Sequence, residues 1–264
     1  MNNKGIGVFD SGVGGLTVAK EIMKQLPYEA IYYLGDTARA PYGSKTKDTI
    51  IRFSRENVSF LLKKDVKIIV VACNTSSALA LKTLRKEFKI DIIGVIEAGA
   101  RAAIDATKNK RIGIIGTKAT INSGAYEEVI KKNDGKIKVF SYATPLLVPL
   151  VEEGWLNEKE TVIILKKYLF FFADKKIDTL LLGCTHYPLL KNAIKKIMPG
   201  VKIIDSAIEV SKTIGTILKD KNIMAARNNS RKTAFYVTDT PEQFNKIAGM
   251  FLDRTDINAG KVFL

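Results

Sequence analysis

Cysteine and histidine are scarce in this sequence of 264 residues, which contains two cysteines and one histidine. Two cysteines are too few for a disulfide framework, and no group of cysteine and histidine has the spacing of a structural zinc site. The sequence therefore predicts no bound metal and two free thiols, as is usual for a protein of a reducing compartment.

Long apolar runs are also missing. No run reaches the roughly 18 residues that a membrane-spanning helix needs. The N-terminus, MNNKGIGVFDSG, has no apolar core ahead of a cleavage site. The run TVIILKKYLFFF at 161–172 is too short to span a bilayer and predicts a buried helix. We expect a cytoplasmic protein with no membrane partner.

Blocks of like charge are missing as well, although 42 Lys and Arg against 27 Asp and Glu give a formal net charge of +15. Lysine pairs such as Lys63-Lys64 and Lys166-Lys167 are spread over the whole chain, and aromatic residues do not alternate with them as a base-stacking surface requires. The pattern indicates a solvated lysine-rich surface and no specific nucleic-acid partner. Such a surface still concentrates an anionic small substrate.

Apolar segments alternate with amphipathic ones along the chain. Continuous Val/Ile/Leu runs, such as 68–71 and 180–182, are typical of parallel strands that helices cover on both faces. The alternating order predicts an α/β fold. Strands are expected at 5–9, 30–34, 66–72, 91–96, 111–115, 137–140, 177–182 and 201–204, and helices at 15–25, 46–63, 75–87, 99–107, 122–132, 158–173 and 189–197.

The two halves of the chain share a faint internal repeat. Each half opens with an Ile-Gly strand and continues, at a similar distance, to a buried strand that ends in a cysteine. The segments are GIGVFDSG at 5–12 and KIIVVACNTSSA at 67–78, then RIGIIGTK at 111–118 and DTLLLGCTHYPL at 178–189. Ligands of open α/β sheets bind beyond the carboxyl ends of the strands. The repeat therefore predicts two similar parallel-sheet α/β domains that face each other, with the two thiols across a cleft.

Both cysteines have sequence neighbours that suit a reactive thiol. A free cysteine is usually a small buried hydrophobe. Here Cys73 and Cys184 each lie where a strand gives way to a helix, and a helix N-terminus favours the thiolate. His186, the single histidine, is two positions from Cys184, where it can act as an acid, a base or a thiol activator.

Carboxylates and glycines follow the first two strands. Asp10 closes the first strand, where a carboxylate can position an ammonium group. The glycines at 12–15 can bring backbone N–H groups to an anion, but their spacing fits neither a Walker A motif nor a full dinucleotide fingerprint. Asp36, in GDTARAPYG at 35–43, can play the same part as Asp10, although a turn or a helix cap is its default explanation.

Three further features complete the residue-level interpretation. Tyr42-Gly43 can offer a pair of backbone N–H groups to a carboxylate, whereas surface placement is the default explanation of Glu152-Glu153. No lysine stands in a motif that marks a pyridoxal phosphate site. Two thiols facing a cleft, with carboxylate and imidazole helpers, indicate proton transfer on opposite faces of one carbon without a cofactor.

Five segments together resemble the bacterial glutamate racemase family. They cover about the first 210 residues, and the chain length also fits. Members of that family interconvert L- and D-glutamate without a cofactor, and D-glutamate feeds peptidoglycan synthesis. The segments are GVFDSGVGGLTV at 7–18, YLGDTARAPYG at 33–43, VACNTSSA at 71–78, VPLVEEG at 148–154 and LGCTHYPLL at 182–190.

The resemblance implies a role for each matching residue. Cys73 and Cys184 correspond to the two acid/base cysteines, with Cys73 taking the proton from D-glutamate and Cys184 from L-glutamate. Asp10 assists the first thiol, and His186 and Glu152 assist the second. The implied substrate-binding residues are Asp10, Ser11, Tyr42, Gly43, Asn74, Thr75, Thr117, Thr185 and His186.

The resemblance also implies how the domains are arranged. The second domain, at 98–207, is inserted into the first, which consists of 1–97 and 208–264. Ala98 replaces an expected proline in a linker-like position, and Ser76-Ser77 replaces a commoner Ala-Ser. We expect a homodimer, although the sequence itself carries no signal for the number of subunits.

Two alternatives stay open at the level of sequence. A racemase for aspartate or another amino acid would share the twin-thiol layout and differ only in its substrate pocket. A non-enzymatic anion-binding or nucleic-acid-associated protein would account for the charge of +15 and the glycine-rich loop. Such a binder would have no use for both cysteines.

Overall fold

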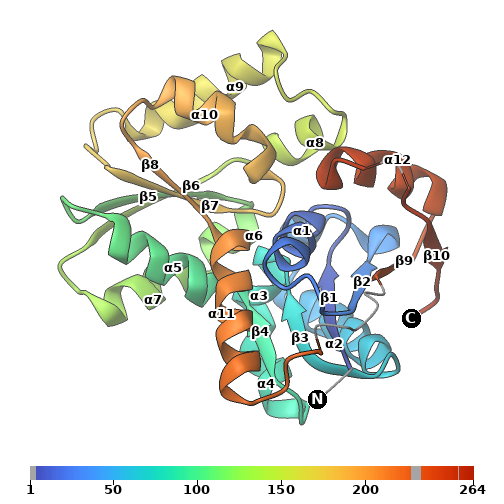
Figure 1. Cartoon of the computed structure of the whole chain (residues 1–264). Coiled ribbons are helices and arrows are strands. Elements are labelled where there is room, and N and C mark those ends of the chain that lie inside the picture. The colour runs from blue at the N-terminus through green and yellow to red at the C-terminus, as the bar shows by residue number, and fades with distance from the viewer. Residues whose placement is uncertain (1–3, 227–232, 255) are drawn as a thin grey trace.

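Two parallel sheets organise the chain in the computed structural model, which describes residues 4–226, 233–254 and 256–264 (Figure 1). The larger sheet has the strand order β10-β9-β2-β1-β3-β4 and the smaller one has β6-β5-β7-β8. The larger sheet contains β1 (Gly5–Asp10), β2 (Ile31–Gly35), β3 (Val66–Val71), β4 (Ile92–Gly94), β9 (Thr233–Val237) and β10 (Ala259–Lys261). The smaller sheet contains β5 (Arg111–Gly116), β6 (Lys138–Ala143), β7 (Thr179–Gly183) and β8 (Lys202–Asp205).

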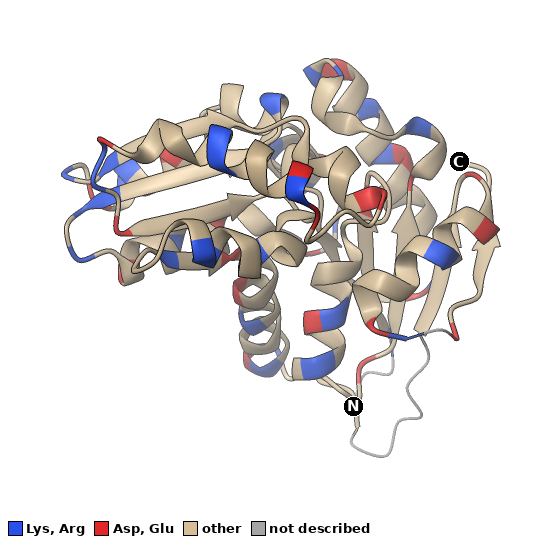
Figure 2. Ribbon diagram, turned by 90° about the horizontal axis from the view of Figure 1, so that it is seen from above, with Lys and Arg blue, Asp and Glu red and all other residues tan. Residues whose placement is uncertain are grey.

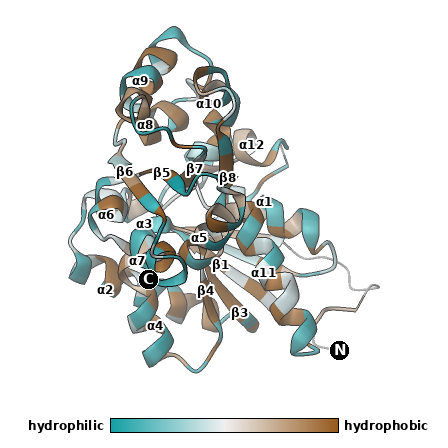
Figure 3. Cartoon of the chain, turned by 90° about the vertical axis from the view of Figure 1, so that its left-hand side faces the viewer, coloured by the Kyte–Doolittle hydropathy of each residue, from teal (hydrophilic) through white to brown (hydrophobic). Residues whose placement is uncertain are grey.

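Helices surround both sheets, and apolar residues gather on the strands between them (Figure 3). The α-helices are α1 (Leu16–Gln25), α2 (Lys47–Leu62), α3 (Asn74–Leu79), α4 (Leu81–Glu87), α5 (Val95–Ala106), α6 (Lys118–Asn122), α7 (Ala125–Asn133), α8 (Leu147–Glu152), α9 (Lys159–Leu169), α10 (Lys191–Ile197), α11 (Ser206–Asp220) and α12 (Pro241–Leu252). The short 3-10 helices are η1 (Thr37–Arg39), η2 (Tyr42–Ser44), η3 (Phe170–Phe172) and η4 (Tyr187–Leu190).

The predicted α/β class is confirmed, and the internal repeat has a structural counterpart. In the larger sheet the opening strand β1 pairs with β3, which leads to Cys73. In the smaller sheet β5 pairs with β7, which leads to Cys184. The order β2-β1-β3-β4 thus matches β6-β5-β7-β8. All residues of β1, β3 and β7 are buried, as their continuous apolar runs predict.

Several expected boundaries are wrong for identifiable reasons. The strand expected at 91–96 ends at Gly94, because the Val95 amide donates to the Ser77 hydroxyl at 3.3 Å and begins α5. Ala98, expected in a linker, therefore lies inside α5. The helix expected at 122–132 is divided by Gly124, whose φ of 67° is left-handed and breaks the helical path between α6 and α7.

The helix expected to be buried at 161–172 is amphipathic instead. Thr161, Leu165 and Leu169 face the core, whereas Ile163 and Phe170 are 64% and 77% exposed. A helix that packs on one side of a sheet buries only the stripe that faces it. None of the helices in the described parts of the chain is both long and apolar enough to cross a bilayer.

The C-terminal part of the chain returns to the larger sheet. β9 pairs in parallel with β2, and β10 pairs with β9. Between the two sheets, α11 packs against both α1 and α5 (Figure 1). The domain limits expected at 97/98 and 207/208 stay a prediction.

Candidate active site

A cavity of about 460 Å³ lies where the carboxyl ends of strands from both sheets meet. Every residue predicted for the site lines it except Asp10, which is buried behind it. The predicted residues that line it are Ser11, Tyr42, Gly43, Cys73, Asn74, Thr75, Thr117, Glu152, Cys184, Thr185 and His186. The two thiols, from equivalent strands of the two sheets, therefore share one cavity.

Cys73 lies two residues beyond the end of β3 and immediately precedes the first turn of α3. Its thiol lies 3.8 Å from the Ser11 hydroxyl. Burial and the negative charge of Asp10 raise the pKa of Cys73 to about 11, although backbone and side-chain contacts with Ser76 oppose the shift. The expected preference of a helix N-terminus for the thiolate is outweighed here, so Cys73 is protonated at neutral pH.

Cys184 has a different set of neighbours. Its Sγ lies 3.8 Å from Nδ1 of His186, and Nε2 of His186 lies 2.8 Å from Oε1 of Glu152. Burial lowers the pKa of His186, but the contacts with Cys184 and Glu152 outweigh burial and raise it to about 10. The ring of Phe251 in α12 packs edge-on against the imidazole, with 5.7 Å between centroids. An imidazolium therefore stands beside the second sulfur.

Glu152 is partly exposed to solvent and also contacts a buried residue of the site. Its side chain is 40% exposed, as the default surface interpretation expects, yet its carboxylate pairs with the buried His186. The residue closes α8, a helix that the sequence did not predict. The pairing with His186 thus depends on an element that only the folded chain reveals.

Asp10 supports the cavity from behind. Oδ2 accepts a hydrogen bond from the Gly12 amide at 3.0 Å, and Oδ1 accepts one from the Thr185 hydroxyl at 3.5 Å. Burial raises the pKa of Asp10, while the positive charge of His186 and the Gly12 amide act against that shift. Asp10 thus contacts Thr185 and places its charge near Cys73 without lining the cavity.

Hydroxyl groups from both sheets meet at one side of the cavity. The Thr75 hydroxyl lies 3.0 Å from that of Thr117 and 3.2 Å from that of Thr120, and the last two are 3.0 Å apart. Thr117 also caps α6 through the Thr120 amide. Sequence reasoning missed Thr120; its three-residue spacing from a helix-capping threonine is the available signal.

Asn74 presents an unused donor. Its Oδ1 accepts from the Tyr126 hydroxyl at 2.6 Å, which fixes the orientation of the amide. Its Nδ2 is buried and has no hydrogen-bond partner within the described parts of the chain. Since buried polar groups are nearly always paired, this N–H group is suited to a ligand acceptor in the cavity.

The loop after β2 is organised by Asp36. Its carboxylate accepts hydrogen bonds from the Tyr42 hydroxyl, from Arg39 Nε at 2.7 Å and from the Thr238 hydroxyl at 2.9 Å. The Tyr42 hydroxyl also accepts from Asn57 at 3.1 Å. Asp36 thus does more than the turn or cap expected of it: it ties the loop to the end of β9.

The same loop closes against the second sheet at Gly43. A Cβ at Gly43 would lie 2.8 Å from Cβ of Thr117, so a larger residue cannot fit without movement. The backbone N–H groups of Tyr42 and Gly43 lie in the first turn of η2, where they have no partner within the helix. They are suited to bind a carboxylate, as the sequence predicts.

The described residues include no group of three or more His, Cys, Asp or Glu side chains placed to hold a metal ion. The remaining cavity lining is mostly apolar or neutral, with Pro145, Val148 and Pro149 on one wall and Lys118 as a cationic residue. The arrangement can therefore bind a small anionic molecule between two thiols.

Known proteins are similar to this chain in sequence and in fold. A profile of the Asp/Glu/hydantoin racemase family matches residues 13–210. The chain is 49% identical to a glutamate racemase of Persephonella marina, over 98% of this chain and 97% of the relative. Among solved structures, a glutamate racemase isoform of Bacillus anthracis is 43% identical, with a TM-score of 0.96 and 100% and 99% of the two chains covered.

A glutamate racemase of Francisella tularensis, solved in complex with D-glutamate, is 40% identical, with a TM-score of 0.93 and 100% and 98% covered. An aspartate racemase of Picrophilus torridus is 18% identical, with a TM-score of 0.57 and 86% and 97% covered. The last likeness concerns the fold alone.

Proposed function

Because this chain belongs to the Asp/Glu/hydantoin racemase family and is an isomerase of the glutamate racemase type, we propose that it interconverts L- and D-glutamate with two cysteines and no cofactor. The observation that carries the proposal is that Cys73 and Cys184, from equivalent strands of the two sheets, line one cavity. A carbon held between them can lose a proton on one face and gain one on the other.

The reaction consists of two proton transfers at Cα. One thiolate removes the α-proton, so the Cα–H bond breaks and an S–H bond forms. The opposite thiol then gives its proton to the other face, so its S–H bond breaks and a new Cα–H bond forms. The negative charge that develops on the substrate α-carboxylate between the two steps is stabilised by hydrogen-bond donors at the cavity wall.

The surroundings of the two sulfurs support a direction for each cysteine. Cys73, whose pKa is raised to about 11, holds a proton at neutral pH and is ready to donate it. The imidazolium of His186 places positive charge 3.8 Å from Cys184, where negative charge forms when that thiol loses its proton. Cys184 accordingly takes the proton of L-glutamate, and Cys73 takes that of D-glutamate.

The polar groups that line the cavity support a set of proposed substrate contacts. Asn74 Nδ2 and the amides of Tyr42 and Gly43 donate to substrate carboxylates, and the hydroxyls of Thr75 and Thr117 join them. Ser11 and Thr185 complete the polar lining near the two sulfurs. In the cell, we propose that the enzyme supplies D-glutamate for peptidoglycan from the cytoplasm. The expected homodimer stays a prediction.

A circular dichroism assay of the purified chain tests this function. With no cofactor added, the signal of L-glutamate and that of D-glutamate should both decay to zero, the value of the racemic mixture. L-Aspartate under the same conditions is the control for substrate choice and should keep its signal. A chain that leaves both glutamate signals unchanged would refute the proposal.

A further inference from the structure

The glycine-rich turn between β1 and α1 is a contact surface between the two sheets rather than an open anion cradle. A Cβ at Gly14 would lie 2.5 Å from both Nδ1 and Cε1 of His186, closer than real side chains approach. Only glycine at this position lets the loop that carries Thr185 and His186 lie against the turn. The motif at 12–15 therefore has a use that the substrate contacts do not explain.

Thr17, in the first turn of α1, reaches across the same interface. Its buried hydroxyl lies 3.0 Å from the carbonyl oxygen of Thr185 and 2.9 Å from that of Gly14. The Thr185 hydroxyl in turn donates to Asp10 at 3.5 Å. Asp10 at the end of β1 and Thr17 in the first turn of α1 thus hold Thr185 by its side chain and its backbone, respectively.

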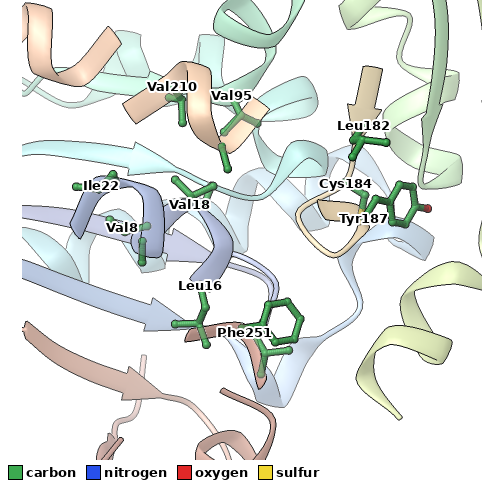
Figure 4. Packing of buried hydrophobic residues seen from close by; sticks show 14 of the residues in the cluster. Val8, Leu16, Val18, Ile22, Val95, Leu182, Cys184, Tyr187, Val210 and Phe251 are labelled. Atoms are coloured by element: carbon green, nitrogen blue, oxygen red, sulfur yellow. The ribbon is translucent and has the colours of Figure 1, made fainter. Parts of the chain in front are cut away.

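We propose that Thr17 is a positioning residue for the Cys184 half of the site, an inference that rests on the function proposed above. Thr185 stands between Cys184 and His186, so fixing its carbonyl fixes the direction of both neighbouring side chains. Figure 4 shows α1 side chains, among them Leu16 and Val18, in the cluster that also contains Cys184. Thr17 is not among the residues that line the cavity, so it acts only through this loop.

The loss of the Thr17 hydroxyl should slow one proton transfer selectively. Without that donor the buried Thr185 carbonyl loses a partner, whereas the Gly14 carbonyl keeps the backbone N–H of Thr17 at 3.0 Å. The loop that carries Thr185 then relaxes away from its position. Transfer between Cys184 and Cα then becomes slower, because proton transfer depends steeply on geometry. The transfers made by Cys73 keep their geometry.

Rates alone cannot reveal such selectivity, but isotope effects can. The two enantiomers have equal free energy, so the ratio of kcat/KM for the two directions stays at one in every variant. The Cys184 step breaks the substrate Cα–H bond when L-glutamate reacts and forms the new one when D-glutamate reacts. When this step limits the rate more strongly, the α-deuterium isotope effect on kcat/KM rises for L-glutamate and falls for D-glutamate.

Thr17→Val and Thr17→Ser make the test, because valine keeps the shape without the hydroxyl and serine keeps the hydroxyl. Thr17→Val should lose about tenfold in kcat/KM in both directions. Its α-deuterium isotope effect on kcat/KM should be larger than that of the parent chain for L-glutamate and smaller for D-glutamate. Thr17→Ser should stay within about twofold of the parent chain. Thr161→Val is the matched control: it removes a buried hydroxyl that donates to the Trp155 carbonyl at 2.6 Å, away from the cavity, and should change neither rates nor isotope effects.

Three results would overturn the role of Thr17: parental kinetics in Thr17→Val, a loss of rate with unchanged isotope effects, or no rescue by serine. Thermal unfolding of each variant shows that it is folded, and Thr17→Ala carries the same test if valine prevents folding. A parent chain that racemises no glutamate would instead refute the proposed function, whereas an active parent with an indifferent Thr17→Val refutes this inference alone.

Discussion

The two sulfurs of the cavity occupy equivalent strand ends but meet different charges. Cys73 has the Ser11 hydroxyl at 3.8 Å and the negative field of the buried Asp10. Cys184 has the imidazole of His186 at the same distance. In the proposed reaction one sulfur donates a proton while the other accepts one. The difference in charge around the two sulfurs suits them to these opposite tasks when L-glutamate reacts.

Replacing either thiol should abolish racemisation in both directions, because each direction needs both. Cys73→Ala should lower the rate by ~10²–10⁴-fold, the range expected for loss of a general base. Exchange of the α-proton with solvent should survive only with L-glutamate, and in Cys184→Ala only with D-glutamate. Proton NMR in deuterium oxide measures the exchange. Full racemase activity in either variant would contradict the two-base mechanism.

Asp10 should control how readily Cys73 reacts. Its negative charge helps to raise the pKa of that thiol, so Asp10→Asn should lower the pKa and increase the thiolate fraction at pH 8. Alkylation of Cys73 by iodoacetamide, followed by peptide mass spectrometry, should become about 3- to 10-fold faster. Glu153→Gln, which changes an exposed carboxylate outside the cavity lining, is the control and should leave the alkylation rate unchanged.

His186 should make folding stability depend on pH. Its pKa is raised to about 10 in the folded chain, above the ordinary 6.5. The stabilisation is therefore complete below about pH 6.5 and disappears as the pH rises through 10. Urea unfolding should show the parent chain about 1–3 kcal/mol more stable than His186→Asn near pH 6.5, with the difference shrinking toward pH 10. A constant difference over that range would argue against a charged imidazole.

At the scale of elements, the cavity depends on close contacts between segments from the two sheets. The clearest is the approach of η2 to the cap of α6, where Gly43 faces Thr117. Glu152, the last residue of the short helix α8, makes a further contact beside the cavity through its pairing with His186. These contacts place hydrogen-bond donors from both sheets around one cavity.

Gly43→Ala should therefore weaken substrate binding. The added Cβ meets Thr117 at 2.8 Å and pushes η2 away from α6. The KM for glutamate should rise about tenfold, with a smaller effect on kcat. Gly135→Ala is the matched control, since the nearest atom to its Cβ is 3.8 Å away. Unchanged KM in Gly43→Ala would show that the loop tolerates the displacement.

The sequence predicts an element well when neighbouring residues carry its pattern, and poorly when a distant segment places it. The central strands and both cysteines are readable because uninterrupted apolar runs lead directly to Cys73 and Cys184. β9 is different: it is five residues long and alternates in burial, and pairing with β2 places it in the sheet. The resemblance, rather than residue patterns, returned 208–264 to the first domain.

The polar contacts of the site show the same limit. Cys73, Asn74 and Thr75 follow one strand, so the sequence predicts them together. The sequence does not predict Thr120 or Thr17, because their partners come from the other half of the chain: Thr75 for the former and Thr185 for the latter. Such pairs have no signature at fixed spacing in the sequence.

At the scale of the whole molecule, the net charge of +15 is distributed rather than focused. Figure 2 shows Lys and Arg on the elements around both sheets, with Asp and Glu among them. Several basic side chains are paired at the surface, for example Arg55 with Glu87 and Lys131 with Glu127. No single face collects the excess in this view.

Duplex DNA should consequently bind weakly and without sequence preference. Fluorescence anisotropy of a labelled duplex should show affinity that falls steeply between 50 and 200 mM salt, because only counterion release drives such binding. An unrelated basic protein of similar net charge is the control and should behave alike. Tight, sequence-dependent binding at physiological salt would reveal a nucleic-acid partner.

The match between the strand orders of the two sheets bears on symmetry. Two identical subunits related by a two-fold axis would surround both sulfurs with the same residues, since every contact in such a pair occurs twice. In a single polypeptide, two sheets of matching strand order and their helices form two similar lobes that need not have identical residues around the sulfurs. Each lobe then evolves its own neighbours for its own sulfur, so a nearly symmetric scaffold carries a carboxylate behind one thiol and an imidazole beside the other.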